Sequence, residues 1–532
     1  AGRLGRFGQG VLVAPLAALV GLDLDAVVVV GVSEGTCPAP RRDDALVSDA
    51  DRLSAEPAPG ELIVRRNAVH DEHRRFMAAL AAGGRHRVLI QARGDHRSGH
   101  HRLPSRWLLD AATHLVGAAV YSSDLDDIVH PAIVQVASSV DGLRTAARPA
   151  TPDELDLQLL VRHCDEGRAV ADHPLASHDP VASGLALQTA RSSASLTRFD
   201  GYMPGVTLAA SPLDAIQSPT RLETYAECPF RYLLVNVLRL SEAPEPEDLL
   251  SIDALSRGHL VHTVLERFLL PVIDEPPHLR PQPGTPWPPH ERARLRSIAL
   301  DVFADFEAKG LTGRPMLWRV ERGQILEMLD DWLTDDDGLR QKHGSVPEAL
   351  EMAFGLSPDV GPLEVALGDG RTVLFRGRAD RVDRTVDGGT LVLDYKTGKD
   401  SYKASKVDPL RGGKKLQLAV YGLAARQRYG GVAKALYWFL AESGQARRRG
   451  YTVDDAIETT LATTVRTMVD GIEAGVFPAV PGEEDWFSGT NKNCRYCAFD
   501  SLCPRDRLAT FEAKQDDPAL AGYLSLGAEV TQ

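Results

Sequence analysis

The sequence lacks any apolar run approaching the roughly 20 residues that a membrane-spanning helix needs, so we expect no membrane segment. Its first ten residues, AGRLGRFGQG, contain no apolar stretch of the kind found in secretory signals. They also do not resemble a natural start, so we expect a fragment of a longer protein. No G-x-x-x-x-G-K-[ST] motif occurs, which excludes ATP hydrolysis at a P-loop by this chain alone.

Acidic residues outnumber basic ones, 73 to 60, and cysteine is scarce. The net charge is −13, which argues against a protein coated in basic charge for nucleic-acid binding. A local basic segment nevertheless begins at Lys396, and its candidate DNA-contacting residues are Lys399, Lys403, Lys406, Arg411, Lys414 and Lys415. With only six cysteines and no export signal, metal binding is favoured over a disulfide framework.

The length of 532 residues allows two to four domains, and the pattern of elements is α/β. Residues 24–32 are predicted to be a buried strand, residues 86–92 another strand, and residues 67–83 an amphipathic helix. Residues 116–195 are predicted to be mainly helical, and 210–220 to be a linker or a helix entry.

The second half of the chain changes from helices to strands. Helices are predicted over 221–238, interrupted at Pro229, and within 251–336. Strands within 350–356, 363–368, 372–384 and 390–398, separated by Gly-rich turns, fit an antiparallel meander. A helix over 415–430 and a strand over 433–441 follow.

The stretch LVLDYKTG, residues 391–398, places an acid and a base at the end of an apolar strand. Residues i and i+2 of a strand share a face, so Asp394 and Lys396 point the same way and Tyr395 the other. A buried charge is costly unless it is paired or binds a metal. The pattern therefore leaves open an Asp–Lys ion pair and a metal site.

Other polar residues precede and follow this strand. His262 and Glu266, in GHLVHTVLE, lie one helical turn apart, and Asp380, in GRADRVD, lies in the preceding strand. Two carboxylates and an imidazole suit Mg²⁺ or Mn²⁺ better than structural zinc. Lys396 beside such an ion could orient or deprotonate a water that attacks phosphorus.

The ordered set G-x-x-x-H-x-x-L-E, G-x-x-D-R-V-D, D-Y-K-T-G and Q-x-x-x-Y resembles the RecB-type branch of the PD-(D/E)xK nucleases. The resemblance implies a restriction-endonuclease-like core, a mixed sheet flanked by helices. It implies that the metal is held by His262, Asp380, Asp394 and the Tyr395 carbonyl. It assigns Lys396 as the catalytic lysine and Gln417 and Tyr421 to support of the site or the DNA, and leaves Glu266 open between a structural and a functional role.

Four cysteines fit a related pattern. CRYCAFDSLC supplies Cys494, Cys497 and Cys503, and Cys228 lies in YAECPFRY. This spacing lacks the second close pair of a zinc ribbon. It is similar to the iron–sulfur nucleases of the AddAB and AdnAB type, which implies that the four thiolates hold a 4Fe-4S cluster. Zinc is the alternative.

The N-terminal part resembles the end of a UvrD-type, superfamily-one helicase domain, in LVGLDLDAVVVVGVSEGTCP and DEHRRFMAALAAG. The family's A-L-T-R-A is Ala79–Gly83 here, so its phosphate-contacting arginine is missing. We therefore expect a degenerate helicase remnant over 1–195, a linker over 196–220, the nuclease over 221–515 and a tail over 516–532.

Together these patterns predict a cytoplasmic, nucleoid-associated DNA nuclease that cuts single strands fed from double-strand ends. It would pair with an ATP-driven helicase–nuclease subunit and use Mg²⁺ or Mn²⁺. The alternatives are a stand-alone iron–sulfur single-strand exonuclease, which residues 1–115 disfavour, and a non-catalytic DNA-holding scaffold.

Overall fold

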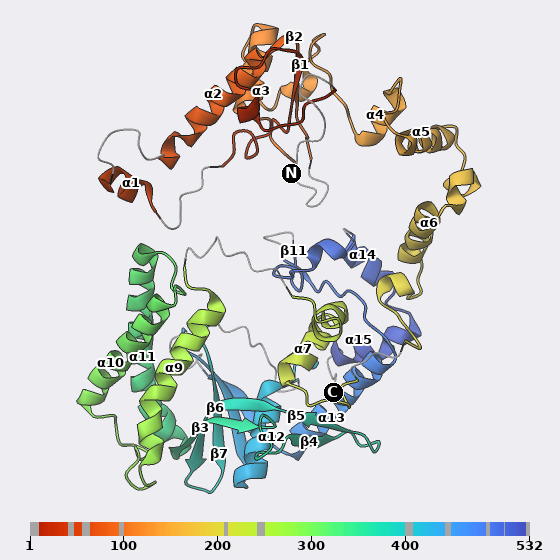
Figure 1. Ribbon diagram of the computed structural model, residues 1–532. Coiled ribbons are helices and arrows are strands. Elements are labelled where there is room, and N and C mark those ends of the chain that lie inside the picture. The colour runs from red at the N-terminus through yellow and green to blue at the C-terminus, as the bar shows by residue number, and fades with distance from the viewer. Residues whose placement is uncertain are drawn as a thin grey trace. The chain divides into compact units, whose positions relative to one another are not determined.

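The structure is a computed structural model that describes residues 10–40, 47–55, 64–94, 101–206, 211–241, 251–398, 408–441, 448–485, 490–504 and 506–527. The chain forms two compact units, Ala1–His178 and Asp179–Gln532 (Figure 1). Within the ranges just given, no helix combines the length and apolar character needed to cross a membrane.

The first unit is built on a small parallel sheet. Its elements are α1 (Asp49–Ala55), β1 (Leu24–Val30), α2 (Ala68–Ala81), β2 (Gly83–Ile90), α3 (Arg106–Val116), α4 (Ser139–Thr145) and α5 (Pro152–Asp165). β1 and β2 pair in parallel. The core of this unit joins Val27 and Val29 of β1 to Phe76 of α2 and Trp107 of α3.

The strand predicted at 24–32 forms, but the prediction that it is buried is wrong for one of its faces. Val27 and Val29 are buried, whereas Val28 and Val30 are 54% and 70% exposed. Neighbouring residues of a strand point to opposite sides, and the helices of this unit cover one side only. The predicted helix at 67–83 and the predicted strand at 86–92 are confirmed as α2 and β2.

The second unit contains a five-stranded mixed sheet. Its helices are α6 (Asp179–Ser192), α7 (Pro219–Glu227), α8 (Pro229–Tyr232), a π-helix (Leu233–Val237), α9 (Ala254–Asp274), α10 (Pro289–Ala308), α11 (Pro315–His343), α12 (Gln417–Tyr429), α13 (Asp455–Glu473), α14 (Arg507–Glu512) and α15 (Ala521–Gly527). Its strands are β3 (Ser345–Phe354), β4 (Leu363–Ala366), β5 (Thr372–Phe375), β6 (Gly377–Thr385), β7 (Thr390–Lys396), β8 (Ala433–Phe439), β9 (Arg448–Val453), β10 (Glu484–Asp485) and β11 (Thr490–Asn491).

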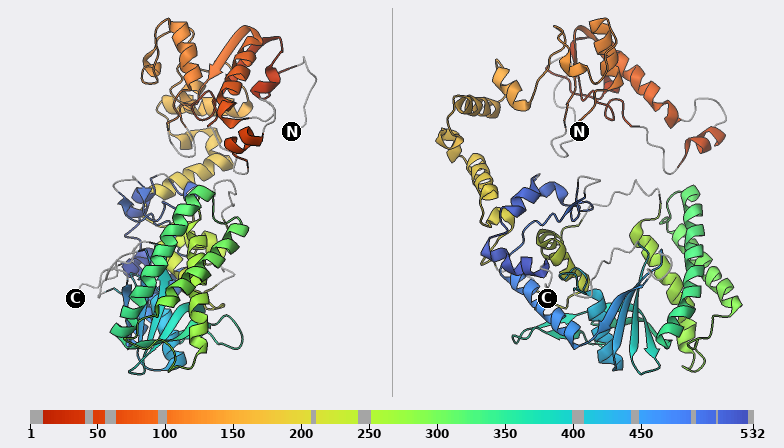
Figure 2. Two further views of the ribbon diagram at one scale, coloured as in Figure 1. Left: turned by 90° about the vertical axis from the view of Figure 1, so that its left-hand side faces the viewer. Right: turned by 180° about the vertical axis from the view of Figure 1, so that it is seen from behind.

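The strand order of the main sheet is β3-β6-β7-β8-β9. β7 and β8 are parallel, and the other neighbouring pairs are antiparallel. Helices α9, α10 and α11 pack on one face and α12 and α13 on the other, which Figure 2 also shows from behind. β7 is therefore covered on both sides, as LVL predicted: Leu391 and Leu393 enter one core and Val392 the other.

The predicted meander needs two corrections. β4 and β5 form a separate two-stranded sheet, and β3 pairs directly with β6 in the main sheet. The strand predicted over 372–384 is two strands, divided at Arg376. There the Arg376 N–H donates to the Gln217 carbonyl and the Gln217 N–H donates to the Leu374 carbonyl, so a distant segment of chain pairs with the end of β5.

Residues 196–206 and 211–220 are packed within the second unit. Tyr202 pairs with Val476 and Gln217 with Phe375 in isolated bridges, and the Leu196 N–H donates to Asp517 at 2.7 Å. Leu520 is fully buried, so the segment expected as a tail belongs to the same packed unit. The division between units lies at 178/179, ahead of the expected boundary at 195.

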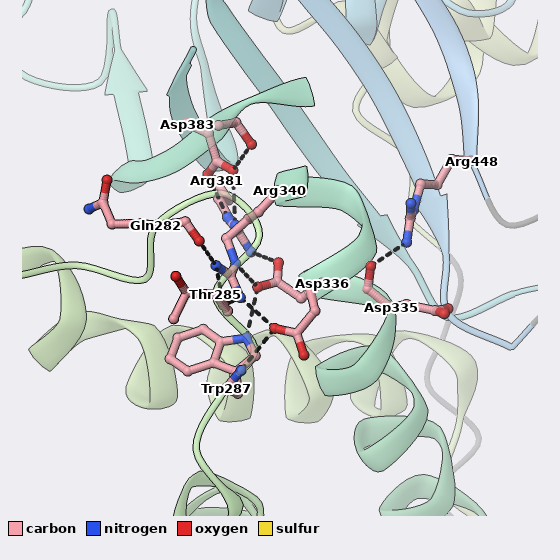
Figure 3. A network of polar contacts seen from close by, with 11 residues as sticks. Gln282, Thr285, Trp287, Asp335, Asp336, Arg340, Arg381, Asp383 and Arg448 are labelled. Carbon is pink, nitrogen blue, oxygen red and sulfur yellow. Dashed lines mark hydrogen bonds and ion pairs between the residues drawn. The ribbon is translucent and has the colours of Figure 1, made fainter. Parts of the chain in front are cut away.

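A buried ionic network joins α11 to β6 (Figure 3). Arg381 Nη1 donates to Asp336 Oδ1 and Arg381 Nε to Asp383 Oδ1, each at 2.6 Å. Arg340 Nε donates to Asp336 Oδ2 at 2.9 Å, as does Trp287 Nε1 at 2.8 Å. The four charged side chains have no exposed surface. Asp336, in the acid-rich stretch DDWLTDDDG at 330–338, is thus a core residue.

Candidate active site and cysteine cavity

The end of β7 carries the acid and base of D-Y-K. Asp394 and Lys396 form an ion pair on one face of the sheet, while Tyr395 packs on the other against Trp332 and Trp438. Burial raises the pKa of Asp394 to about 6, although the Lys396 charge opposes this shift. Burial lowers the pKa of Lys396, but the charge of Asp394 outweighs it and the net direction is upward.

His262, on α9, reaches the same strand end. Its Nε2 lies 3.1 Å from the Tyr395 carbonyl oxygen, and its Nδ1 lies 3.3 Å from Asp380 Oδ1. Asp380 Oδ2 accepts the Tyr395 N–H at 2.7 Å. Burial lowers the pKa of His262. The hydrogen bond and the charge of Asp380 raise this pKa by more, so the net shift is upward. Residues from α9, β6 and β7 are thus brought together at the end of the sheet where β7 finishes.

Gln417 and Tyr421 extend this group from α12. Gln417 Oε1 accepts hydrogen bonds from Lys396 Nζ at 3.2 Å and from the Tyr437 hydroxyl at 3.4 Å. Tyr421 is buried against Phe354, and burial strongly raises the pKa of its phenol. The two residues that the Q-x-x-x-Y motif indicated therefore lie beside the strand end.

A cleft of about 670 Å³ opens over these groups. His262, Asp380 and Lys396 line it, as do Glu266 and Glu351. Asp394 is 4% exposed and lies beneath this lining. Glu266, whose role the sequence left open, is exposed and faces the cleft.

Glu351 is the functional candidate that the sequence reasoning missed. It lies within β3 at φ 47°, a backbone conformation that residues other than glycine rarely adopt. Burial and the charges of Asp380 and Glu266 raise its pKa to about 7. The only sequence signal was an acid inside the apolar strand LEMAF.

The four cysteines of the predicted cluster surround one cavity. Cys228 follows α7 directly, and the other three lie between β11 and α14. Cys228, Cys494, Cys497 and Cys503 all line this cavity as free thiols. Burial, together with the neighbouring sulfurs, raises the pKa of Cys503 to about 12. Cys37 and Cys164 belong to the first unit.

A family model described as the PD-(D/E)XK nuclease superfamily matches residues 217–504, more than half of the chain. The chain belongs to the PD-(D/E)XK nuclease superfamily. The matched range begins just before α7 and ends just after Cys503, so it contains the sheet, the cleft and the four cysteines.

The relatives of this nuclease are named as the B-type subunits of ATP-dependent helicase/deoxyribonucleases. The one from Moorella thermoacetica is 26% identical over 421 residues, covering 76% of this chain and 33% of the relative. The subunit of the same name from Heliobacterium modesticaldum is 25% identical over 448 residues, covering 74% of this chain and 35% of the relative. The nuclease chain thus spans about a third of the length of these relatives.

The crystal structure of SSO0001 aligns with 47% of this chain and 97% of its own, at 16% identity and a TM-score of 0.19. That similarity is too low to bear on the fold.

The side chains of this PD-(D/E)XK site have the chemistry that a hard divalent ion requires, since they offer carboxylate oxygens and one imidazole. Among the described residues, no three His, Cys, Asp or Glu side chains already form a ligating group. His262 pairs with Asp380, and Asp394 pairs with Lys396. Asp394 Oδ2 is buried and contacts Lys396 Nζ, so an ion at this oxygen would share it with the lysine.

The structure describes three of the six basic residues predicted to contact DNA. Lys415 lines the cleft of the nuclease. Arg411 and Lys414 lie in the same segment, outside the cleft lining, and burial lowers the pKa of Lys414. Lys399, Lys403 and Lys406 lie outside the described residues.

Proposed function

We propose that this chain is the nuclease part of a bacterial helicase–nuclease that resects double-strand breaks, and that it hydrolyses single DNA strands in the cleft over β7. The observation that carries the proposal is the convergence of His262, Asp380 and Lys396 on that cleft, with Asp394 beneath it. The names of the relatives support a DNA substrate and a partner subunit.

The side chains divide the work of phosphodiester hydrolysis. His262, Asp380, Asp394 and the Tyr395 carbonyl would hold Mg²⁺ or Mn²⁺, which supplies Lewis acidity at the phosphate and lowers the pKa of water. Lys396 is fixed by Asp394 and Gln417, which use two of its three N–H donors. The third can orient the attacking water or a phosphate oxygen.

The bond changes then follow from water attack on phosphorus. A new P–O bond forms to the water oxygen and the bond to the 3′-oxygen breaks. The products are a 5′-phosphate and a 3′-hydroxyl. The proton of the hydroxyl comes from solvent or from the attacking water.

The cysteine cavity takes no part in these steps, because hydrolysis moves no electrons. Its four thiolates would hold a 4Fe-4S cluster that fastens α7 to the C-terminal segment.

The test is digestion of end-labelled single-stranded DNA with Mg²⁺, with and without a partner helicase. Asp394→Ala should abolish cleavage while DNA binding and any partner-driven unwinding remain. Lys396→Ala should lower the rate by about 100-fold or more. EDTA should stop the reaction.

The matched control is Asp387→Ala, an exposed acid in the turn between β6 and β7, which should cleave at the wild-type rate. Mg²⁺-dependent cleavage by purified Asp394→Ala would refute the assignment. Cleavage without any helicase partner, together with failure to copurify with an ATPase, would instead favour the stand-alone exonuclease.

A further inference from the structure

Glu223, on α7, is a buried carboxylate that the proposed chemistry does not use. It is 8% exposed. Glutamate is rarely buried to this degree unless its oxygens are paired, because burial removes the water that stabilises the charge. Its contacts therefore indicate what it does.

Glu223 Oε1 accepts two backbone N–H groups at the start of α12. The Leu416 N–H donates at 2.6 Å and the Gln417 N–H at 3.2 Å. Leu416 is the N-cap of α12 and has no side chain able to accept these N–H groups. A carboxylate from another helix thus performs the capping, where the helix dipole favours negative charge.

The capped residue touches the catalytic lysine. Gln417 is the first residue of α12, and its Oε1 accepts the hydrogen bond from Lys396 Nζ at 3.2 Å. Because the Gln417 N–H is held by Glu223, the position from which the Gln417 side chain reaches Lys396 is also held.

Helix α7 is itself held firmly. The Tyr225 hydroxyl donates to the Val476 carbonyl at 2.9 Å, and Leu222 and Tyr225 are buried in the core shared with α12 and α13. Cys228 follows the last residue of α7 and lines the cysteine cavity. One short helix therefore carries both a cavity cysteine and the cap of α12.

We propose that Glu223 is a positioning residue for the nuclease reaction, which sets Gln417 and through it Lys396. This inference rests on the proposed function of the cleft. It predicts a loss in the chemical step and not in DNA binding, because Glu223 contacts the support of Lys396 and lies outside the cleft lining.

The experiment compares Glu223→Ala, Glu223→Gln, Gln417→Ala and the double variant Glu223→Ala/Gln417→Ala in single-turnover cleavage of a single-stranded oligonucleotide. Glu223→Ala should lower the maximal rate about 10- to 100-fold at unchanged DNA affinity. Glu223→Gln should restore most of the rate, because its amide oxygen can accept the same two N–H groups. The double variant should be no slower than Gln417→Ala, because both changes interrupt one path.

The matched control is Glu227→Gln, on the same helix, whose side chain is 40% exposed. It should behave as wild type. A folded Glu223→Ala variant that cleaves at the wild-type rate would overturn the inference. Rate losses that multiply in the double variant would overturn it as well.

Backbone amide exchange at Leu416 and Gln417 separates this inference from the proposed function. Exchange should accelerate in Glu223→Ala and return to normal in Glu223→Gln, whether or not the protein cleaves DNA. Unchanged exchange overturns the inference even if the wild type is an active nuclease. A wild type without Mg²⁺-dependent cleavage refutes the proposed function, and the exchange result still decides whether Glu223 holds α12.

Discussion

At the scale of single residues, Glu351 combines a strained backbone with an unfavourable charge environment. Its φ of 47° turns the side chain out of the regular alternation of β3. The carboxylate faces the cleft together with Asp380 and Glu266, and Arg378 lies 3.5 Å away. Burial and the like charges keep the proton on Glu351 to a higher pH than usual, with a pKa of about 7. A bound cation would relieve this repulsion.

The raised pKa of Glu351 predicts a pH-dependent stability in metal-free buffer. Between pH 4.5 and about 7 the unfolded chain has lost the proton that the folded protein keeps, so the free energy of unfolding falls as pH rises. Glu351→Gln removes this contribution. Its melting temperature relative to wild type should therefore increase from pH 4.5 to 7 and then level off, measured in EDTA. Glu364→Gln, at an exposed position of β4, is the control and should parallel wild type. Parallel curves for Glu351→Gln would contradict the assigned environment.

At the scale of elements, the network around Arg381 fastens β6 to α11. Arg381 and Asp383 come from the strand, and Asp336 and Arg340 from the helix. Asp380 precedes Arg381 in the strand and presents its carboxylate to Tyr395 and His262. The network therefore fixes the strand that carries a proposed metal ligand.

Removing one member of this network should be costly. Asp336→Ala leaves Arg340 and Arg381 buried without their shared carboxylate, and we expect the free energy of unfolding to fall by about 3–5 kcal/mol. Urea unfolding of the purified protein measures this. Asp301→Ala, on the exposed surface of α10, should change it by less than about 0.5 kcal/mol. A loss at Asp336 as small as that at Asp301 would show that the two arginines do not depend on this carboxylate.

The sequence predicted the elements whose signals are local. The apolar run before Asp394 indicated a strand covered on both faces, and the i, i+2 spacing indicated that Asp394 and Lys396 share a face; both are confirmed. The ion pair and the candidate metal site, which the pattern left as alternatives, involve the same two side chains.

The misses come from contacts between distant segments. Gln217 pairs with the end of β5 from far upstream in the chain, and no property of the stretch 372–384 indicates this contact. Nothing in the sequence distinguishes Glu223 or Asp336 from the surface acids of other helical segments. Their partners, Leu416 and Arg381, become neighbours only after the sheet and helices have assembled.

At the scale of the whole molecule, the cysteine cavity joins the two ends of the nuclease unit. Cys228 precedes the sheet, and Cys494, Cys497 and Cys503 follow it. A bond network linking them would close a loop around the entire core. Cross-links over loops of roughly 100 residues or more restrict the unfolded chain by several kcal/mol in the chain-entropy description.

Cys497→Ala should therefore lower the iron content of the protein and weaken this closure. We expect a lower melting temperature of the second unit and faster proteolysis near Cys228 and the C-terminal cysteines, with the first unit still folded. Cys164→Ala, at an exposed position in the first unit, is the control. Unchanged melting and protease resistance in Cys497→Ala would refute the structural role. Stoichiometric zinc without iron after anaerobic purification would refute the iron–sulfur assignment.

The interlocking of α7 with the C-terminal segment also constrains how the protein is made. Tyr225 donates to the Val476 carbonyl, and the Tyr523 hydroxyl donates to the Ala226 carbonyl. At 5–20 residues per second, a ribosome needs roughly 13–60 s to proceed from α7 to these partners. Helix α7 therefore leaves the ribosome long before its binding surface exists, and its apolar face must stay soluble or be chaperoned during that interval. Loading of the cysteine cavity has to follow synthesis of nearly the whole nuclease unit.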